Sequence, residues 1–398
     1  MSRRISIVGG GMVGASLALA LQPQARHCGW RIELIEAQPP VSGELQPSFD
    51  ARSTALSHGS RLLFERLGVW AGVQAEAAPE PIRQIHVSDR GHPGVTRLHA
   101  EQERVPALGY VVENAQLGRA LLGALDERVV KWQAPARVVR AEPARTGWLL
   151  QVEQDGQVHE QATDLLVLAD GGRSGLLEQL GIHRQVRPYG QTAIIANIAS
   201  SQGHEGVAYE RFTESGPLAL LPMSGGRSAL VWTQPEAQAD DVMALSDAGF
   251  LHALQDAFGF RMGALKRVGA RHSYPLSLIE AEEQVRTGLV VLGNAAHSLH
   301  PIAGQGFNLS LRDVMALADT LSSAAPDQSP GELALLNGYL QRQRQDQQQT
   351  IAFSDGLTRL FSNRRPVLAA GRNLGLLGMD IVAPLKSVFA RQAMGLKG

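Results

Sequence analysis

The chain has 398 residues, a length that predicts two closely packed domains rather than one compact core. Its formal net charge of −1 and its aromatic content of 5% argue against a nucleic-acid partner, because such proteins carry basic patches and stacking residues. The single cysteine, Cys28, excludes an intramolecular disulfide and a thiolate-rich metal site and indicates a reducing compartment. We expect a cytoplasmic protein, since no apolar run reaches the length of a membrane span and no signal-peptide pattern is present.

A glycine-rich turn follows the first predicted strand, ISIV, and leads into an apolar helix. Gly9, Gly11 and Gly14 have the GxGxxG spacing, in which the glycines permit a tight turn, a close approach to a pyrophosphate and close helix–strand packing. Glu36 ends the second predicted strand, where a carboxylate can accept hydrogen bonds from an adenosine ribose. This unit predicts a site for FAD or NAD and does not distinguish between them.

The middle of the chain alternates predicted helices and strands. A helix is expected from about Ser57, and Arg52 precedes it, where a guanidinium can neutralise a diphosphate or make an ordinary surface ion pair. A strand-rich insertion with a helix at about 115–127 follows, and it returns to the first sheet through DLLVLADGGRS, a buried strand that ends in a glycine turn. A second strand-rich block at about 189–280, with one helix near 240–258, predicts a substrate-side sheet.

A strand and loop, GLVVLGNAAHSLHPIAGQG, then returns to the first domain, a helix begins at GQGFNL, and a long helix is expected at about 330–363. The three glycine-bearing strand ends GGGMVG, ADGGRS and GNAAHSLHPIAGQG would meet at one sheet edge if their strands are parallel neighbours. A flat ring lying against backbone would need Gly304 and Gly306, because a Cβ would occupy its place. Asn294 can hydrogen-bond a ribityl hydroxyl, and Pro301 stiffens the loop. An ordinary glycine turn that caps a helix is the alternative.

Together, GGGMVG with Glu36, DARSTAL, ADGGRS and GNAAHSLHPIAGQGFNL resemble the FAD-dependent aromatic hydroxylases of the para-hydroxybenzoate hydroxylase type, and within them the ubiquinone-biosynthesis hydroxylases. The resemblance spans residues 1 to about 365. It implies an α/β fold of the group A flavin monooxygenase architecture. The expected parts are a Rossmann-like FAD-binding domain (1–75, 100–185 and 285–330), a strand-rich substrate domain (76–99 and 186–284) and a C-terminal helical region (331–398).

The resemblance also implies roles for individual residues. The expected FAD contacts are Gly9, Gly11, Gly14, Glu36, Arg52, Asn114, Asp170, Gly171, Asn294, Gly304, Gly306, Phe307 and Asn308. Asp170 and Gly171 match a pair that serves both FAD and the nicotinamide donor, and backbone N–H groups near Phe307 and Asn308 would face the pyrimidine edge of the flavin. Asn294 stands where the family has an aspartate, so a charge-assisted hydrogen bond is lost and weaker FAD binding is expected.

The implied activity is hydroxylation of a polyprenylated phenol, of the 2-polyprenyl-6-methoxyphenol type, in ubiquinone biosynthesis through a flavin C4a-hydroperoxide. FAD, O₂ and NAD(P)H or another electron donor are the expected cofactors, and a dry apolar pocket walled by LALLPM and SALVW is required. Pro301 and His300 are the catalytic candidates, although the flavin itself carries the chemistry. No metal is expected, because no cysteine or acidic cluster accompanies His297 and His300.

The C-terminal segment 364–398 is apolar with interspersed arginine and lysine. It is suited to the surface of the inner membrane or to another ubiquinone-biosynthesis enzyme, and packing against its own domain is the equal alternative. Three other functions stay open from the residues. They are a nicotinamide dehydrogenase, an FAD-dependent dehydrogenase or prenyl reductase that does not use oxygen, and a noncatalytic FAD-bearing subunit.

Overall fold

The computed structural model describes residues 3–38, 52–325, 327–361, 373, 375, 378, 380 and 383–396. Its first layer is a six-stranded sheet with the order β19-β20-β12-β1-β2-β8. The strands are β1 (Arg4–Val8), β2 (Arg31–Ile35), β8 (Val130–Gln133), β12 (Leu165–Leu168), β19 (Val285–Arg286) and β20 (Leu289–Val291). All pairs are parallel except the one that β19 makes with β20. The strands read as continuous apolar runs because both faces of the sheet are covered.

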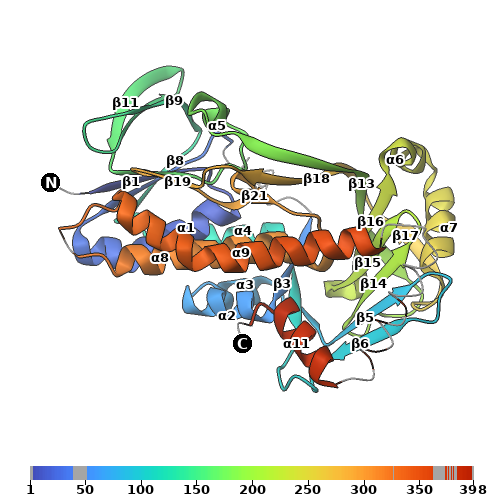
Figure 1. The fold of residues 1–398 in the computed structure, drawn as a ribbon. Helices are drawn as coiled ribbons and strands as arrows, with labels where there is room; N and C mark the ends of the chain where they lie inside the picture. Colours follow the sequence, from blue (N-terminus) through green and yellow to red (C-terminus); the bar gives the residue numbers. More distant parts are fainter. Residues whose placement is uncertain are drawn as a thin grey trace.

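Helices cover one face of this sheet and a small sheet covers the other (Figure 1). Ile5 and Ile7 of β1 pack in a cluster with α1 (Met12–Cys28), α4 (Asn114–Gly123) and α8 (Gln305–Ser322). Val8 belongs to a second cluster with α5 (Leu176–Gln179) and the three-stranded sheet of β9 (Ala136–Pro143), β10 (Trp148–Gln154) and β11 (Gln157–Thr163). The alternation along β1 therefore separates two hydrophobic cores.

A three-stranded sheet of β3 (Ser53–Ser57), β7 (Gly109–Glu113) and β4 (Glu80–Ile82) lies beside the helical layer. The helix expected from about Ser57 begins there, since the Ser57 hydroxyl accepts a hydrogen bond from the backbone N–H of Ser60 at 3.2 Å. This helix is α2 (His58–Arg66). Gly68, which has a φ of +73°, follows its end, and a further helix, α3 (Trp70–Glu76), comes next.

The second half of the molecule is a nine-stranded sheet with the order β21-β18-β13-β16-β15-β14-β5-β6, and β17 pairs with β13. Its strands are β5 (Gln84–Asp89), β6 (Val95–His99), β13 (Arg184–Ser200), β14 (Val207–Thr213), β15 (Gly216–Met223), β16 (Arg227–Pro235), β17 (Leu265–Val268), β18 (His272–Ala281) and β21 (His297–Ser298). The long strands β13 and β18 run from the first sheet into the second (Figure 1). The strand-rich block predicted at 189–280 is therefore one sheet, which also takes in β5 and β6.

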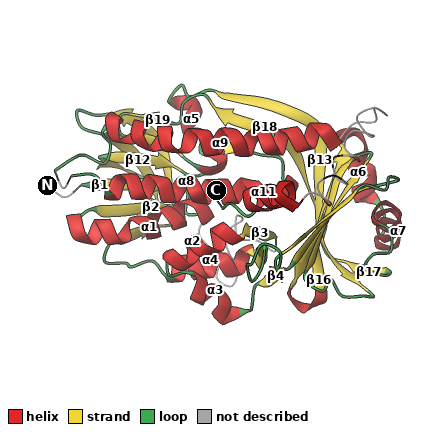
Figure 2. Cartoon of the chain, turned by 60° about the horizontal axis from the view of Figure 1, so that its bottom comes forward, coloured by secondary structure: helices red, strands yellow, loops and turns green. Residues whose placement is uncertain are grey.

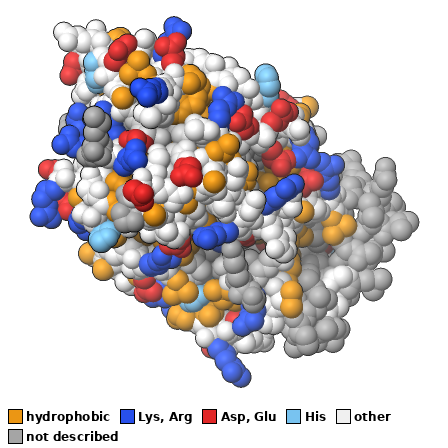
Figure 3. Space-filling view, turned by 60° about the vertical axis from the view of Figure 1, so that its left-hand side comes forward, with side chains coloured by type: hydrophobic (Ala, Val, Ile, Leu, Met, Phe, Trp, Pro, Cys, Tyr) orange, Lys and Arg blue, Asp and Glu red, His pale blue; other side chains and the backbone are white. Residues whose placement is uncertain are grey.

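The outer face of this sheet is covered by α6 (Glu236–Ala244) and α7 (Asp247–Phe258), as Figure 2 shows. The single helix predicted near 240–258 is wrong, because Leu245 has an extended ψ of 146° and the Ser246 hydroxyl caps α7 by accepting from Gly249 N–H at 3.2 Å. On the face in Figure 3, basic and acidic side chains are mixed. The division into domains by residue range stays a prediction.

The C-terminal region is helical where it is described. The predicted long helix is α9 (Leu333–Phe361), which lies along α8 and reaches from one sheet to the other (Figures 1 and 2). The last helix is α11 (Ala383–Ala393), and Ala390 and Met394 pack in a core cluster with the substrate-side sheet. Most of the segment that precedes α11, residues 362–382, lies outside the described residues.

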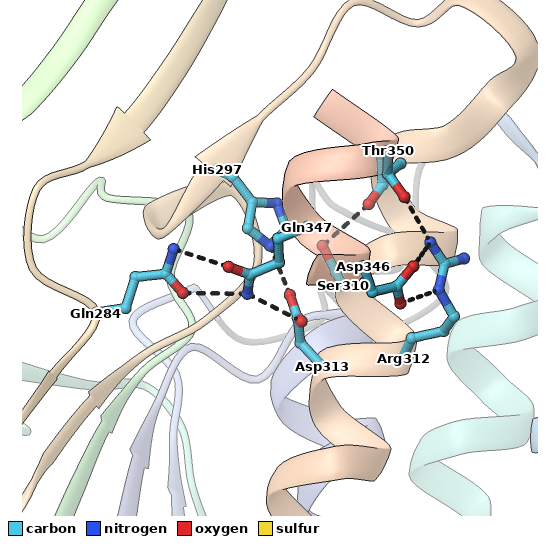
Figure 4. Close-up of polar contacts among 9 residues, drawn as sticks. Gln284, His297, Ser310, Arg312, Asp313, Asp346, Gln347 and Thr350 are labelled. Atoms are coloured by element: carbon cyan, nitrogen blue, oxygen red, sulfur yellow. Dashed lines mark hydrogen bonds and ion pairs between the residues drawn. The ribbon is translucent and has the colours of Figure 1, made fainter. Parts of the chain in front are cut away.

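A buried polar network joins α8, α9 and the loop before α8 (Figure 4). His297 Nε2 lies 2.5 Å from Asp313 Oδ2, and both side chains are almost completely buried. Asp313 Oδ1 accepts from the amide of Gln347 at 3.0 Å, and Gln347 exchanges two amide hydrogen bonds with Gln284. Because His297, Asp313 and Gln347 are buried, each depends on its partners in the network for its hydrogen bonds.

We expect Asp313→Ala to lower the free energy of unfolding by roughly 3–5 kcal/mol, because it leaves His297 and Gln347 buried without their acceptor. The measurement is urea unfolding followed by circular dichroism. The matched control is Asp319→Ala on the same helix, whose exposed carboxylate pairs with Arg66 and should contribute less than about 1 kcal/mol. Equal losses in the two variants would contradict a stabilising role for the buried network.

Candidate active site

Three glycine turns converge at the carboxyl edge of the first sheet. The strands β20, β12 and β1 are parallel neighbours, which confirms the arrangement expected from the sequence. Each strand ends in a residue with left-handed backbone, namely Gly9 after β1 (φ +102°), Gly171 after β12 (φ +71°) and Gly293 after β20 (φ +64°). In open α/β sheets ligands bind at this edge, so the convergence defines the candidate site.

Two glycines of the GxGxxG motif have no room for a side chain. A Cβ on Gly9 would lie 2.7 Å from the backbone of Ala169 and Asp170, and a Cβ on Gly14 would lie 1.9 Å from the carbonyl oxygen of Gly9. Gly11 is the N-cap of α1 and makes no side-chain capping bond, so the positive end of the helix is open to an anion. These residues fit the diphosphate of a dinucleotide.

Two further predicted contacts lie at the rim of this turn. The Glu36 carboxylate accepts hydrogen bonds from Gly10 N–H (2.7 Å) and Gln38 N–H (2.9 Å), which hold it at the end of β2. The guanidinium of Arg52 lies over the ring of Tyr274, 5.2 Å from its centroid, and its side chain also lines the cavity. Both residues therefore have partners within the protein and keep a face towards the candidate site.

Asn114 and Asp170 support the backbone around the site. Asn114 Oδ1 accepts from the Thr54 hydroxyl at 2.6 Å, and its N–H donates to the carbonyl of Arg52 at 2.8 Å. Asp170 accepts from the N–H groups of Gly172 (3.0 Å) and Ser174 (2.6 Å), so its carboxylate fixes the ADGGRS turn. Asn294, by contrast, has an exposed side chain that lines the cavity.

The third turn leads into the N-terminus of α8. Gly304 has a φ of +61° and is the N-cap without a side-chain capping bond, so the N–H groups of the first turn are open. A Cβ on Gly306 would meet no protein atom within 4 Å, and Gly306 lines the cavity. The Asn308 side chain points elsewhere, since it accepts from Ser57 N–H at 2.9 Å and donates to Ala55 at 2.9 Å. A flat ring with a partly negative edge fits this helix end.

These features line one cavity of about 950 Å³. All the expected FAD contacts line it except Gly14. Gly14 instead lets α1 pack closely against the end of β1. The walls towards the second sheet are apolar. They are formed by Ile85, Val87, Leu98, Ala208, Phe212, Ala219, Leu221, Val231, Leu357, Phe389 and Ala393. Ala219 and Leu221 lie in LALLPM and Val231 in SALVW, as the sequence indicates, whereas the contribution of α11 was not expected.

The two catalytic candidates lie differently. Pro301 lines the cavity, whereas His300 is not among the described residues that line it. The His300 ring is buried against Tyr189, with ring centroids 5.2 Å apart, and its Nδ1 accepts from Ile302 N–H at 3.2 Å. Burial lowers the pKa of His300 to about 4, so the imidazole is neutral at pH 7. The catalytic role expected of His300 is thus unsupported, and its contacts indicate that it holds the loop in place.

Sequence reasoning also missed Glu210, which lines the apolar part of the cavity. The signal for it was the alternation in VAYERFT, which places Glu210 on the same face of the strand as Ala208 and Phe212. Within the described residues, no group of three or more His, Cys, Asp or Glu side chains is placed to hold a metal ion.

The comparisons with known proteins agree with this geometry. The model of the FAD-binding domain family matches residues 3–354, and the chain belongs to this family. The ubiquinone hydroxylase UbiL of Rhodospirillum rubrum is 37% identical over 98% of this chain and 89% of its own length. The 3-demethoxyubiquinol 3-hydroxylase of Escherichia coli is 33% identical over 98% of both chains. The expected resemblance to ubiquinone-biosynthesis hydroxylases is confirmed.

The fold is shared with solved structures of FAD-dependent monooxygenases. The p-nitrophenol 4-monooxygenase PnpA of Pseudomonas putida superposes with a TM-score of 0.80 over 100% of this chain and 99% of its own, at 14% identity. HpxO of Klebsiella pneumoniae, solved with FAD and uric acid, gives a TM-score of 0.75 over 98% and 97% of the two chains, at 20% identity. The predicted architecture, the FAD cofactor and the monooxygenase class are confirmed.

Gly306→Ala separates cofactor fit from protein packing. We expect the Kd for FAD to rise at least about tenfold, equivalent to roughly 1.4 kcal/mol, because the new methyl group enters the cavity. The apoprotein should keep its stability, since the methyl group meets no protein atom within 4 Å. Fluorescence titration with FAD measures the effect. Gly123→Ala, at the end of α4, is the control, because it is equally unhindered and does not line the cavity. Unchanged affinity in Gly306→Ala would place the ring elsewhere.

Proposed function

We propose that this chain hydroxylates the aromatic ring of a polyprenylated phenol, a precursor of ubiquinone, with FAD, O₂ and a nicotinamide donor. The observation that carries the proposal is that one cavity joins the glycine turns of the dinucleotide site to an apolar chamber. The names of the relatives from Rhodospirillum rubrum and Escherichia coli point to ubiquinone-pathway substrates. A phenol that carries an isoprenoid chain matches the apolar walls.

The residues of the chain have separate tasks in this reaction. Gly9, Gly11 and Glu36 would hold the adenosine diphosphate part of FAD, and Asn294 would contact its ribityl chain. Bound FAD supplies the activation of O₂, which no side chain of the protein can provide. The first turn of α8 stabilises negative charge at the edge of the ring, because its N–H groups are not capped by a side chain. The apolar walls exclude water, which protects reactive oxygen from loss as hydrogen peroxide.

The activity is tested with the purified FAD-loaded protein, NADH or NADPH, and a 2-prenyl-6-methoxyphenol carrying a short isoprenoid chain. We expect oxygen uptake and a product that gains one oxygen atom, and this atom should carry the label when heavy-oxygen O₂ is supplied. Mass spectrometry of the product is the measurement. Flavin reduction with no incorporation of oxygen would contradict hydroxylation and would favour an FAD-dependent dehydrogenase or reductase. The ring position of the new hydroxyl group follows from the fragmentation pattern.

We also propose that α11 brings the chamber to a membrane surface, where a polyprenylated substrate resides. Phe389 and Ala393 of this helix line the cavity, while the side chain of Val388 is 64% exposed and faces away from the core. Arg391 on the same helix is exposed, which suits an anionic surface. Within the described residues, no helix is both long and apolar enough to cross a bilayer.

We expect Val388→Glu to reduce cosedimentation with vesicles of anionic phospholipid, because it replaces an exposed apolar group by a charge of the same sign as the lipid. Val158→Glu is the matched control. Val158 is 58% exposed, and it lies on β11 of the sheet β9-β10-β11 and not on α11. Equal binding of both variants and the wild-type protein, or no binding of the wild-type protein, would contradict the contact.

A further inference from the structure

Glu210 lies in the middle of β14, and the register of the sheet fixes where its side chain points. It is paired with Ala219 of β15 and with Val87 of β5, and both partners line the cavity. The preceding residue, Tyr209, packs on the opposite face, with its ring 5.4 Å from that of Phe258. Successive side chains of a strand alternate between faces, so the carboxylate points into the chamber.

Among the described residues, the chamber wall beside this carboxylate offers no group of opposite charge. Its neighbours on the same face, Ala208, Phe212, Ala219 and Val87, are apolar. Within the described residues, Glu210 has neither an ion-pair partner nor a hydrogen bond that explains its position. Desolvation raises the pKa of Glu210 to about 7, so the carboxyl group changes its protonation state near neutral pH. A buried acid without a partner is costly to keep, which is typical of a functional group.

The other charged groups near the chamber are engaged elsewhere. Glu36 and Asp170 accept backbone hydrogen bonds at the dinucleotide turns. Arg52, Arg137 and Arg173 line the same FAD-side part of the cavity. Two strands pair with β14. The strand β15 has no titratable side chain. In β5, His86 contacts the Tyr209 ring on the opposite face of the sheet, and Asp89 accepts a hydrogen bond from Asn373 at 2.9 Å. The helices α9 and α11 present Leu357, Phe389 and Ala393.

Glu210 also lies next to the loop that follows the third glycine-bearing strand. Its register partner Val87 and its face neighbour Phe212 belong to one hydrophobic cluster with Ile302 and Leu357. Ile302 follows Pro301, and both residues line the cavity. The carboxylate is therefore placed where the substrate-side sheet meets the loop of the proposed flavin site.

We propose that Glu210 is a catalytic residue that accepts the phenolic proton of the substrate during hydroxylation. The inference rests on the proposed function, because it identifies the group that activates the ring. A phenol has a pKa near 10 and is mostly protonated at pH 7, so its ring is less electron-rich than that of the phenolate. A carboxylate in an apolar chamber is a suitable base for the hydroxyl group of a substrate that fills the chamber.

The proton transfers balance over the reaction. As a ring carbon bonds to one oxygen atom of O₂ and the O–O bond breaks, the phenolic proton passes to Glu210 and the ring becomes a dienone. The ring carbon then loses its own proton, which completes the water molecule formed from the other oxygen atom, and Glu210 returns its proton to the phenolic oxygen. The nicotinamide donor supplies the two electrons as a hydride, and solvent supplies one proton. These two hydrogens become the hydrogen of the new hydroxyl group and the first hydrogen of the water molecule, and the Glu210 carboxylate is regenerated.

The test compares wild-type holoenzyme with Glu210→Gln, which has the same shape and cannot accept a proton at this pH, and with Glu210→Asp. Glu214→Gln, an exposed residue just after β14, is the control. The first readout is the absorbance of 4-nitrophenol bound to the oxidised holoenzyme. The pKa of this phenol lies close to that of Glu210, so the spectrum reports phenolate formation without turnover. The second is kcat for hydroxylation of 2-prenyl-6-methoxyphenol between pH 5.5 and 8.5, a range of about 1.5 units on either side of the Glu210 pKa.

In the wild-type enzyme we expect phenolate formation and kcat to rise with pH through about 7, because Glu210 accepts a proton only when it is ionised. Glu210→Gln should lose both effects and about 10²-fold in kcat, with FAD content and the rate of flavin reduction unchanged. Glu210→Asp should recover part of the rate. A Glu210→Gln enzyme that hydroxylates at the wild-type rate with the wild-type pH profile would overturn the assignment.

The two proposals fail in different ways. If the wild-type holoenzyme binds 4-nitrophenol as phenolate, Glu210→Gln does not, and no hydroxylated product forms from the prenylated phenol, the role of Glu210 as the base stands and the proposed function is wrong. If product forms and neither the phenolate signal nor the pH profile responds to Glu210→Gln, the proposed function stands and the role of Glu210 is wrong.

Discussion

The structure depends on the meeting of three parallel strand ends at one edge of a sheet. Each strand, β1, β12 and β20, is followed by a turn in which a glycine has left-handed backbone, so the backbone comes close to a ligand at this edge. No other residue fits at Gly9 in the first turn, since a Cβ there would lie 2.7 Å from the backbone of the second turn. Close packing of the strand ends and access for a cofactor thus both require glycine in these turns.

The second sheet converts this edge into a reaction chamber. The long strands β13 and β18 connect the two sheets, while α9 lies across both and contributes Leu357 to the cavity. Because α8 and α9 are fastened to each other by the buried network of His297, Asp313 and Gln347, the glycine turn before α8 is held against the wall of the chamber. The position of a bound ring relative to the apolar wall is therefore set by groups that do not touch it.

The sequence predicted the parts that are encoded locally. Strands with continuous apolar runs, glycine turns and the long helix α9 leave short-range patterns, and these elements are found where they were expected. Glu210 could not be found in the same way, because its surroundings arise only when β14 pairs with β5, more than a hundred residues earlier in the chain. The stacking of Arg52 on Tyr274 and the place of α11 in the cavity wall likewise depend on distant contacts. The break between α6 and α7 was missed because their combined apolar spacing continues across Leu245.

The strand order of the first sheet has a consequence for how the protein is made. β1 leaves the ribosome first, yet its partner β12 begins at Leu165 and the next strand, β20, begins at Leu289. During synthesis, β2 can pair early with one edge of the strand Arg4–Val8, whereas the other edge stays unpaired until Leu165–Leu168 has been made. Such long-range pairing slows folding and leaves an unpaired strand edge open to other chains. Overproduction in a heterologous host is thus expected to depend on the supply of chaperones and on a moderate rate of translation.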